Sequence, residues 1–462
     1  MHFHRPLATL VAAMLLSLPL SRPLAAQADL PIKDTTLANG LRVIVIENHA
    51  VPLVTVELNV KNGAYTESPE YDGLSHLYEH MFFKANKAIP SQEAYLARLR
   101  ELGGSWNGTT SGERVNYYVT VGTDSIVPTM QFMEDAIRYP LFLPDELVRE
   151  RPVVIGEFDR NEANPFFHLL RGIDTLLWTP EFYSRKNTIG NREVILTTTQ
   201  QKMQEIQNRF YVPNNTALIL AGDVSPANGF KLAAQVFGDW PRGADPFATP
   251  APNAPVLKES AAAVVEKPVN GLTVFYQWQG PSVMDDPKST YAADVLSQVL
   301  NNPSSPFQKR LVDGGLTFTA QIGYNTLNHV GPISVFAQTT PDKLASAQAV
   351  LMEELAKLAD PNYLPQEMLD AAQKSLGIQA LYEREQPSEW AHTVGYWWAV
   401  ADLDYYRGYV PNMQKITRAD MAEYAKKYIV GKPFVVGALL SPEMREQTQL
   451  TPESLLKTRI VP

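Results

Sequence analysis

The chain has 462 residues, no cysteine and a formal net charge of −9. Without cysteine there can be no disulfide, no thiolate metal ligand and no lipoprotein anchor on an N-terminal cysteine, and the acidic balance argues against nucleic acid or anionic membrane as a partner. Peptides and proteins remain open as partners, and the length is enough for two or three domains with sizeable cores.

The N-terminal segment 1–28 is predicted to be a secretory signal peptide. Arg5 provides the positive start, residues 7–20 form an apolar run, and residues 26–28 form a small-x-small cleavage site. The run is too short for a membrane-spanning helix, which needs about 20 residues. We expect cleavage after Ala28, with Ala26 as the alternative, and a periplasmic or secreted location. A mitochondrial presequence is the competing interpretation, but that type is amphipathic and richer in arginine.

Hydrophobic patterning and turn residues predict alternating strands and helices near the start of the chain. The predicted strands cover residues 41–46, 51–60, 105–110 and 115–121, and the predicted helices cover residues 74–83 and 91–102. Ser91 is the expected N-cap of the second helix. Pro144 then begins a longer helix, at a position where proline is tolerated. This helix runs through Glu157, and Pro152 and Gly156 inside it predict a kink or an interruption.

Similar elements are predicted in the later part of the chain. Helices are expected over residues 198–209 and 288–300, and strands over 217–221, 262–265, 272–278 and 434–440. Residues 243–255 are rich in proline and alanine and form the expected linker. The aromatic runs 396–398 and 405–406 fall on predicted helices. Such clusters belong more often to a core or an interface than to a ligand site.

The segment His76-Leu77-Tyr78-Glu79-His80 carries the strongest chemical signal in the chain. Histidines four residues apart lie on the same face of a helix, so both imidazoles can bind one metal ion. Glu79 lies beside that face and can hold the water that the ion activates. This order is the inverse of the commoner zinc-protease helix, and it indicates metal-assisted hydrolysis. Two ordinary helix histidines are the competing interpretation.

A glutamate further along the chain extends the motif. Glu157 follows His80 after 76 intervening residues. Together they resemble the pitrilysin family of zinc metallopeptidases, which includes insulin-degrading enzyme and the mitochondrial processing peptidases. The resemblance covers nearly the whole chain after the signal, most strongly residues 36–224. It implies that His76, His80 and Glu157 bind one zinc ion with a fourth position open to water, and that Glu79 acts as the base.

The resemblance also implies an α+β fold, in which two homologous α/β-sandwich domains face each other across a cleft. We place the signal peptide at residues 1–28, the N-terminal zinc-binding domain at 29–242, the Pro/Ala-rich linker at 243–258 and the C-terminal homologous domain, without metal, at 259–462.

The two halves look like distant copies of each other. In each half a buried strand is followed by a Ser-Pro pair, and these pairs begin at Ser225 and Ser441. The offset between the two pairs carries the two histidines of the motif to Ala292 and Leu296, which are not metal ligands. We therefore expect one metal site, in the first half.

Three further residues take roles from the same resemblance. Glu150 lies seven residues before Glu157 on the same helix face, and would stand beside the metal as a catalytic-site group that orients a ligand. A surface carboxylate is the alternative. The stretch with Asn107 and Gly108 is similar to the family's edge strand, which pairs with extended substrate through its backbone. Asn107 would hold the substrate next to the scissile bond, although Asn-Gly is also a common turn dipeptide.

One departure from the family bears on the partners of this chain. Active members carry an arginine and a tyrosine in the second half, and the matching positions here hold Leu311 and Phe318. A phenylalanine cannot donate a hydrogen bond to a developing oxyanion. Since some members divide the work between subunits, we hypothesise a heterodimer in which a homologous partner supplies the arginine and tyrosine. The alternative is substitution from within the chain, by Arg310, Tyr324, Tyr117 or Tyr118.

The favoured function is a zinc-dependent endopeptidase that cuts short or unfolded peptides, with no nucleic-acid partner and no membrane-spanning segment after signal removal. The competing class is a non-catalytic assembly or binding subunit that retains a zinc site. The intact Glu79 argues against this class, because a purely structural site needs no base. A third interpretation, a peptidase devoted to one small precursor peptide, is disfavoured by the secretory signal.

Overall fold

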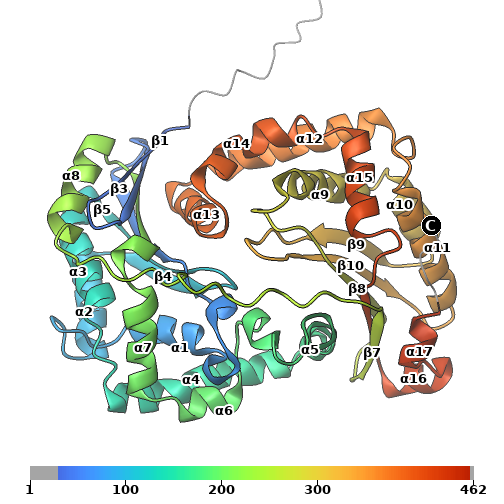
Figure 1. Ribbon diagram of the computed structural model, residues 1–462, viewed down its shortest axis with the longest axis horizontal. Coiled ribbons are helices and arrows are strands. Elements are labelled where there is room, and N and C mark those ends of the chain that lie inside the picture. Colours follow the sequence, from blue (N-terminus) through green and yellow to red (C-terminus); the bar gives the residue numbers. More distant parts are fainter. Residues whose placement is uncertain (1–29, 458–462) are drawn as a thin grey trace, which may run out of the picture.

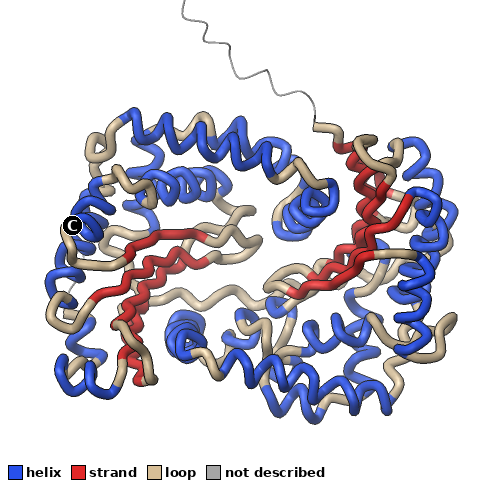
Figure 2. Tube along the Cα trace, turned by 180° about the vertical axis from the view of Figure 1, so that it is seen from behind, coloured by secondary structure: helices blue, strands red, loops and turns tan. Residues whose placement is uncertain are grey.

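The structure is a computed structural model that describes residues 30–457. The predicted signal peptide and its cleavage site lie outside the described residues. Two mixed sheets, one from each half of the chain, form the framework, and helices pack around them (Figure 1; Figure 2). This arrangement confirms the expected α+β fold with two similar halves. Across residues 30–457, no helix combines the length and apolarity needed to cross a membrane.

The first sheet has six strands in the order β1-β2-β6-β3-β5-β4. The strands are β1 (Ile32–Thr36), β2 (Arg42–Glu47), β3 (Leu53–Val60), β4 (Ser105–Thr110), β5 (Val115–Gly122) and β6 (Thr216–Gly222). The helices of this half are α1 (Leu74–Phe82), α2 (Gln92–Leu102), α3 (Ile126–Arg138), α4 (Pro144–Glu162), α5 (Pro165–Trp178), α6 (Arg192–Thr197), α7 (Gln200–Phe210) and α8 (Pro226–Phe237). β2 and β6 are parallel, whereas the other neighbours are antiparallel. Among residues 30–457, β4 lies at an edge of the sheet and pairs with β5 alone.

The second sheet has five strands in the order β7-β11-β8-β10-β9. The strands are β7 (Ala261–Glu266), β8 (Leu272–Gln279), β9 (Thr319–Tyr324), β10 (Pro332–Thr339) and β11 (Val435–Leu440). The helices are α9 (Pro287–Leu300), α10 (Pro306–Gln308), α11 (Leu344–Lys357), α12 (Gln366–Tyr382), α13 (Pro387–Val400), α14 (Leu403–Met413), α15 (Arg418–Tyr428), α16 (Pro442–Thr448) and α17 (Pro452–Leu455). The sheet repeats the pairing of the first one, with β7 and β11 parallel.

The predicted strands and helices are confirmed, with boundaries shifted by no more than a few residues. Ser91 caps α2 by accepting a hydrogen bond from the Ala94 N–H at 3.3 Å. The predicted interruption of α4 is wrong, because the helix continues through Pro152 to Glu162. Pro152 and Val148, whose carbonyl loses its helical partner at this proline, are both exposed. Water can therefore hydrate that carbonyl, which lowers the cost of an internal proline.

The register of the sheets shows that the two halves are copies and corrects their alignment. Leu58 pairs with Tyr117 in the first sheet, and Tyr276 pairs with Val335 at the matching place in the second. The offset between equivalent positions that was expected from the Ser-Pro pairs is therefore wrong, because it is too short by two residues. The Ser-Pro pairs follow loops of different length, since two residues separate β6 from Ser225 whereas β11 leads directly into Ser441.

The corrected offset changes the counterparts of the metal motif. His76 and His80 correspond to Asp294 and Gln298 rather than to Ala292 and Leu296, both of which are buried in the core. Glu157 corresponds to Ser375, and Gln298 donates a hydrogen bond from Nε2 to Ser375 Oγ at 3.0 Å. The second half thus keeps the pair of helices that carries the motif in the first half, α9 and α12 in place of α1 and α4, with different side chains at the matching positions.

Each half lends one helix to the sheet of the other half. Helix α13 packs on β3 and β6 of the first sheet, and α5 packs on β7 and β11 of the second (Figure 1). On α13, Trp390 and Val394 share a core with Ile44 and Ile219 of the first sheet. On α5, side chains such as Leu169 pack against the second sheet beside Gly437, where a Cβ atom would come within 2.5 Å of Leu169. The halves are therefore interlocked.

The aromatic runs belong to these contacts. Tyr405 lies in the main core of the second half, and Tyr406 lies in the core that α13 and α14 share with the first sheet. Trp397 packs against both clusters. The prediction of a core or interface role for these residues is confirmed.

Candidate metal centre

Helix α1 presents one polar face and one apolar face. Leu77, Tyr78 and Met81 are at most 1% exposed and pack into the core of the first half. His76 and His80 share the opposite face with Glu79, as the spacing of the motif requires. This face looks toward α4 and β4, which supply the other residues of the site.

The metal-binding candidates converge between α1 and α4. The Nε2 atom of His76 lies 3.4 Å from Oε2 of Glu157, and Nε2 of His80 lies 3.9 Å from the same oxygen. Their side chains are 14%, 15% and 32% exposed for His76, His80 and Glu157. Within the described residues, these three form the one group of histidine and acidic side chains whose ligand atoms all lie within 4.8 Å of one another.

The geometry and chemistry of this group fit a zinc ion. Ligand atoms about 2.0–2.1 Å from a tetrahedral ion lie about 3.4 Å from each other, which is the separation between His76 and Glu157. Burial, aided by the nearby His80, lowers the pKa of His76 to about 4, so this imidazole is neutral at physiological pH. Two neutral nitrogens and one carboxylate are a ligand set of catalytic zinc sites, which leave a fourth position open.

Glu150 lies behind His80 and is not a surface carboxylate. It is 8% exposed, and its Oε1 atom lies 2.8 Å from Nδ1 of His80. Its second oxygen accepts a hydrogen bond from Lys84, which is 4% exposed. Burial lowers the pKa of His80, but the hydrogen bond and charge of Glu150, together with the charges of Glu79 and Glu157, outweigh burial and the net direction is upward. The contact to Nδ1 leaves Nε2 of His80 directed at Glu157.

Glu79 is held between α1 and the edge strand β4. Its Oε2 atom accepts a hydrogen bond from Thr110 Oγ1 at 2.7 Å. Burial raises the pKa of Glu79, and the hydrogen bond from Thr110 opposes this shift. Gly108 passes so close that a Cβ atom would lie 3.1 Å from Cγ of Glu79. The absence of a side chain at Gly108 therefore lets β4 run directly past the carboxylate.

The structure brings Gly108 to the site but places the side chain of Asn107 elsewhere. Successive residues of a strand point to opposite faces, and the face of β4 with Gly108 and Thr110 contacts Glu79. Asn107 is exposed on the other face, where its strand partner is Tyr118. The segment is a strand rather than a turn.

Sequence reasoning missed Lys84 and Thr110. Lys84 follows His80 by four residues, a spacing that places residues on one side of a helix and could have suggested a link. Thr110 lies two residues after Gly108, on the same face of the predicted strand.

The candidate substitutes for the missing arginine and tyrosine already have partners. Arg310 forms ion pairs with Glu353 and Glu354 of α11. The hydroxyl of Tyr324 donates to Pro281 O at 2.8 Å, and that of Tyr117 lies 2.8 Å from the Tyr211 hydroxyl in the core. The last candidate, Tyr118, packs against His392 with the ring centroids 4.2 Å apart. Phe318, which stands where active members have the tyrosine, is 68% exposed.

Comparison with protein families identifies two consecutive stretches of the chain. Residues 42–176 match the model described as insulinase (peptidase family M16), and residues 197–376 match the model described as the peptidase M16 inactive domain. The chain belongs to the insulinase family of peptidases, family M16.

Individual relatives are distant in sequence. The chain is 23% identical over 334 residues to an uncharacterized zinc protease of Rickettsia felis, which covers 70% of this chain and 77% of that protein. It is 28% identical over 212 residues to insulin-degrading enzyme of Homo sapiens, covering 44% of this chain but only 20% of that enzyme.

Solved structures share the fold. A protease from Helicobacter pylori superposes with a TM-score of 0.79 at 22% identity, covering 88% of this chain and 99% of that one. The periplasmic protease PqqL from Escherichia coli gives a TM-score of 0.75 at 18% identity, covering 93% of this chain and 49% of that one. The present chain therefore spans about half the length of PqqL.

Proposed function

We propose that this chain is a zinc-dependent endopeptidase that hydrolyses peptide bonds in short or unfolded peptides. The observation that carries the proposal is the convergence of His76, His80 and Glu157 within 4.8 Å beside Glu79 and the open edge of β4. A structural zinc site would not need a carboxylate poised next to the ligands, nor a free strand edge. The non-catalytic alternative is therefore less well supported.

In this proposal His76, His80 and Glu157 hold the ion, and Glu150 orients His80. A zinc ion bound there would polarise water and lower its pKa toward neutrality. Glu79 takes the proton from the attacking water and passes it to the leaving amine. The raised pKa of Glu79 makes its carboxylate a better base than an exposed one.

The substrate is proposed to add a strand to the free edge of β4. The outward-facing backbone N–H and C=O groups of an edge strand are unpaired and can bind an extended peptide with little demand on its side chains. Gly108 lies beside Glu79, so a peptide paired there passes the base. Asn107, exposed at the same edge, is proposed to contact the peptide from the face opposite Glu79.

We further propose that a homologous subunit completes the active enzyme. Leu311 and Phe318 replace the arginine and tyrosine of active members, while Arg310, Tyr324 and Tyr117 are committed to other contacts. PqqL, a single chain about twice as long, shows that the fold also occurs joined to further sequence. A heterodimer would supply the missing donors from a second chain.

The domain limits and location are proposed from the same reasoning. The two domains would be residues 29–242 and 259–462, joined by the linker 243–258, which falls within the stretch between α8 and β7. The predicted signal peptide supports a periplasmic or secreted enzyme, as does the description of PqqL as a periplasmic protease.

The test is peptide cleavage by the purified chain without its signal peptide, with zinc quantified on the same sample. One zinc per chain and chelator-sensitive cleavage of unstructured peptides are expected, either alone or after addition of the co-purifying subunit. Glu79→Gln should abolish cleavage while zinc remains bound. Normal cleavage by this variant would refute the mechanism. Zinc binding without cleavage in the native complex would favour the non-catalytic class.

A further inference from the structure

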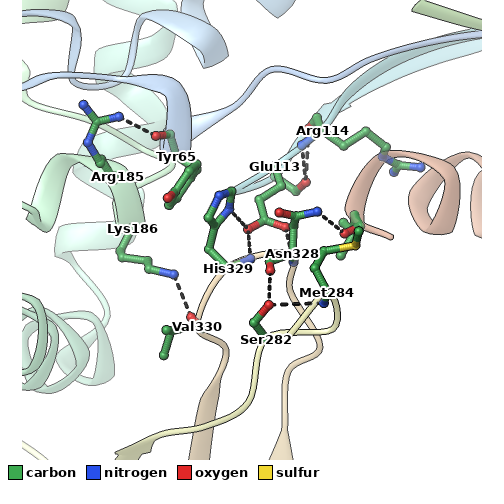
Figure 3. Close-up of polar contacts among 12 residues, drawn as sticks. Tyr65, Glu113, Arg114, Arg185, Lys186, Ser282, Met284, Asn328, His329 and Val330 are labelled. Carbon is green, nitrogen blue, oxygen red and sulfur yellow. Dashed lines mark hydrogen bonds and ion pairs between the residues drawn. The ribbon is translucent and has the colours of Figure 1, made fainter. Parts of the chain in front are cut away.

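The turn between β4 and β5, residues 111–114, is hydrogen-bonded to the second half of the chain (Figure 3). Its last two residues, Glu113 and Arg114, are each only 8% exposed. Buried charges are costly unless they find partners. The hydrogen-bond donors to Glu113 belong to the second half, whereas Arg114 bonds to Asn59 and Thr109 of the first half and to His392 of the second. The β4–β5 turn is therefore built to meet the second half.

Glu113 is bound by the loop between β9 and β10. Its Oε2 accepts a hydrogen bond from the Asn328 N–H at 2.7 Å, and its Oε1 accepts from the His329 N–H at 3.1 Å and from His329 Nδ1 at 3.0 Å. The loop itself is fixed, because Asn328 donates from Nδ2 to Val400 O at 2.9 Å and accepts from Ser282 Oγ at 2.6 Å (Figure 3). One carboxylate thus joins two chain turns that belong to different halves of the molecule.

Arg114, inside the turn, and Tyr65, outside it, add further contacts to the same anchor. Arg114 donates from Nη1 to His392 O of α13 at 2.8 Å. The Tyr65 N–H donates to Gly112 O at 2.7 Å, and the Tyr65 ring stacks on His329 with centroids 3.5 Å apart. The turn is therefore clamped between the first-half segment at Tyr65 and the second half.

The turn directly follows the residue whose hydroxyl binds the proposed base. Thr110 ends β4 immediately before the turn, and its Oγ1 donates to Glu79. In the part of the chain that the structure describes, no strand pairs with the outer side of β4, and edge strands fray more readily than central ones. The position of Thr110, and with it the orientation of Glu79, therefore depends on how firmly the turn is anchored.

We propose that Glu113 is a positioning residue of the peptidase, which anchors β4 to the second half and thereby orients Glu79 through Thr110. In this proposal the half without metal ligands holds β4 in place. β4 provides the edge that pairs with substrate, and its Thr110 donates the hydrogen bond to the base Glu79. This inference rests on the proposed function for its catalytic part. Its structural part, the anchoring of β4, can be measured without any cleavage.

A matched control lies at the other edge of the same sheet. Asp34 on β1 forms an ion pair with Arg407 of α14, so it also joins the two halves. Its side chain is 12% exposed, compared with 6% for Glu113. β1 and β4 are opposite edges of the sheet, so Asp34→Asn removes a contact between the halves without touching β4.

The experiment compares Glu113→Gln, Thr110→Val, their double variant and Asp34→Asn, in the zinc-loaded chain or native complex. We expect Glu113→Gln to lower kcat about 10-fold at unchanged zinc content and to accelerate hydrogen exchange of residues 105–122. Asp34→Asn should leave both unchanged. Because Glu113 acts through Thr110, the loss in the double variant should be no larger than the larger of the two single losses. Should Glu113→Gln fold poorly, His329→Gln removes one of the three hydrogen bonds and should shift both readouts in the same direction.

Additive losses in the double variant, or equal effects of Glu113→Gln and Asp34→Asn, would overturn the proposal. So would unchanged exchange in β4 and β5. A wild-type protein that cleaves nothing, even with its subunit, would instead refute the proposed function, and the exchange data would then decide whether Glu113 anchors β4.

Discussion

Replacing Glu150 with glutamine should weaken zinc binding about 10- to 100-fold. In the structure one carboxylate serves two buried partners, with Oε1 at 2.8 Å from His80 Nδ1 and the other oxygen accepting from Lys84. Glutamine has one acceptor oxygen and a donor amide in place of the second oxygen. Either His80 or Lys84 therefore loses its partner in Glu150→Gln.

The magnitude follows from the hydrogen bond to His80. A hydrogen bond to a charged group contributes about 1.5–3 kcal/mol, and about 1.4 kcal/mol corresponds to a tenfold change in an equilibrium constant. Loss of an outer partner of a metal-bound histidine typically costs 10–100-fold in metal affinity. Both routes give the same range for the rise in the zinc dissociation constant.

The assay is competition for zinc with a chromophoric chelator of known affinity. Glu146→Gln is the matched control, because Glu146 is a buried glutamate one turn earlier on α4 that bonds the backbone N–H groups of Ala85 and Gln92 instead of His80. Its substitution should lower stability and leave zinc affinity unchanged. A dissociation constant for Glu150→Gln within about twofold of wild type, or an equal shift in Glu146→Gln, would refute the reasoning.

Two further outcomes test the packing between the halves. Replacing Leu169, which is fully buried on α5, with alanine should lower the free energy of unfolding by about 2–5 kcal/mol. Since α5 packs on the second sheet, chemical denaturation should still show one transition for both halves, at a lower denaturant concentration. Two separate transitions would contradict the interlocked fold. Burial raises the pKa of Asp174 to about 7, so the folded chain keeps a proton that the unfolded chain releases near pH 4, and stability should fall between about pH 4 and 7 by at most about 1.4 kcal/mol per pH unit. Asp174→Asn should remove this decline in unfolding measurements at pH 5 and 7.5, and an unchanged decline would show that other groups cause it.

Local patterns predicted the parts of the site that depend on local geometry. Residues four apart on a helix share a face wherever the helix lies, so His76 and His80 could be paired from the sequence alone. The edge position of β4 came from the family resemblance, and the structure confirms it. Local rules were less reliable for α4, where exposure of Pro152 decides whether the helix continues.

Contacts between distant segments could not be predicted in this way. Lys84 and Glu150 lie 66 residues apart, and Glu113 and Asn328 lie 215 apart. Nothing in the sequence near Glu113 indicates which backbone groups satisfy its charge, because they belong to the other half. The counterparts of the histidines were missed for a related reason, since a loop shorter by two residues shifted the alignment of the copies.

The second half shows the matching pair of helices without the motif. Asp294, Ser297 and Gln298 occupy the polar face of α9 where the first half has the motif, and Val295 and Leu296 bury the opposite face. Gln298 still contacts the neighbouring helix through Ser375. The corresponding helices of the second half, α9 and α12, thus pack together without histidine or glutamate at the matching positions. The proposed zinc ligands would then be additions to a scaffold that forms without them, and the half that lacks them would serve the proposed reaction through contacts such as Glu113 with Asn328 and His329.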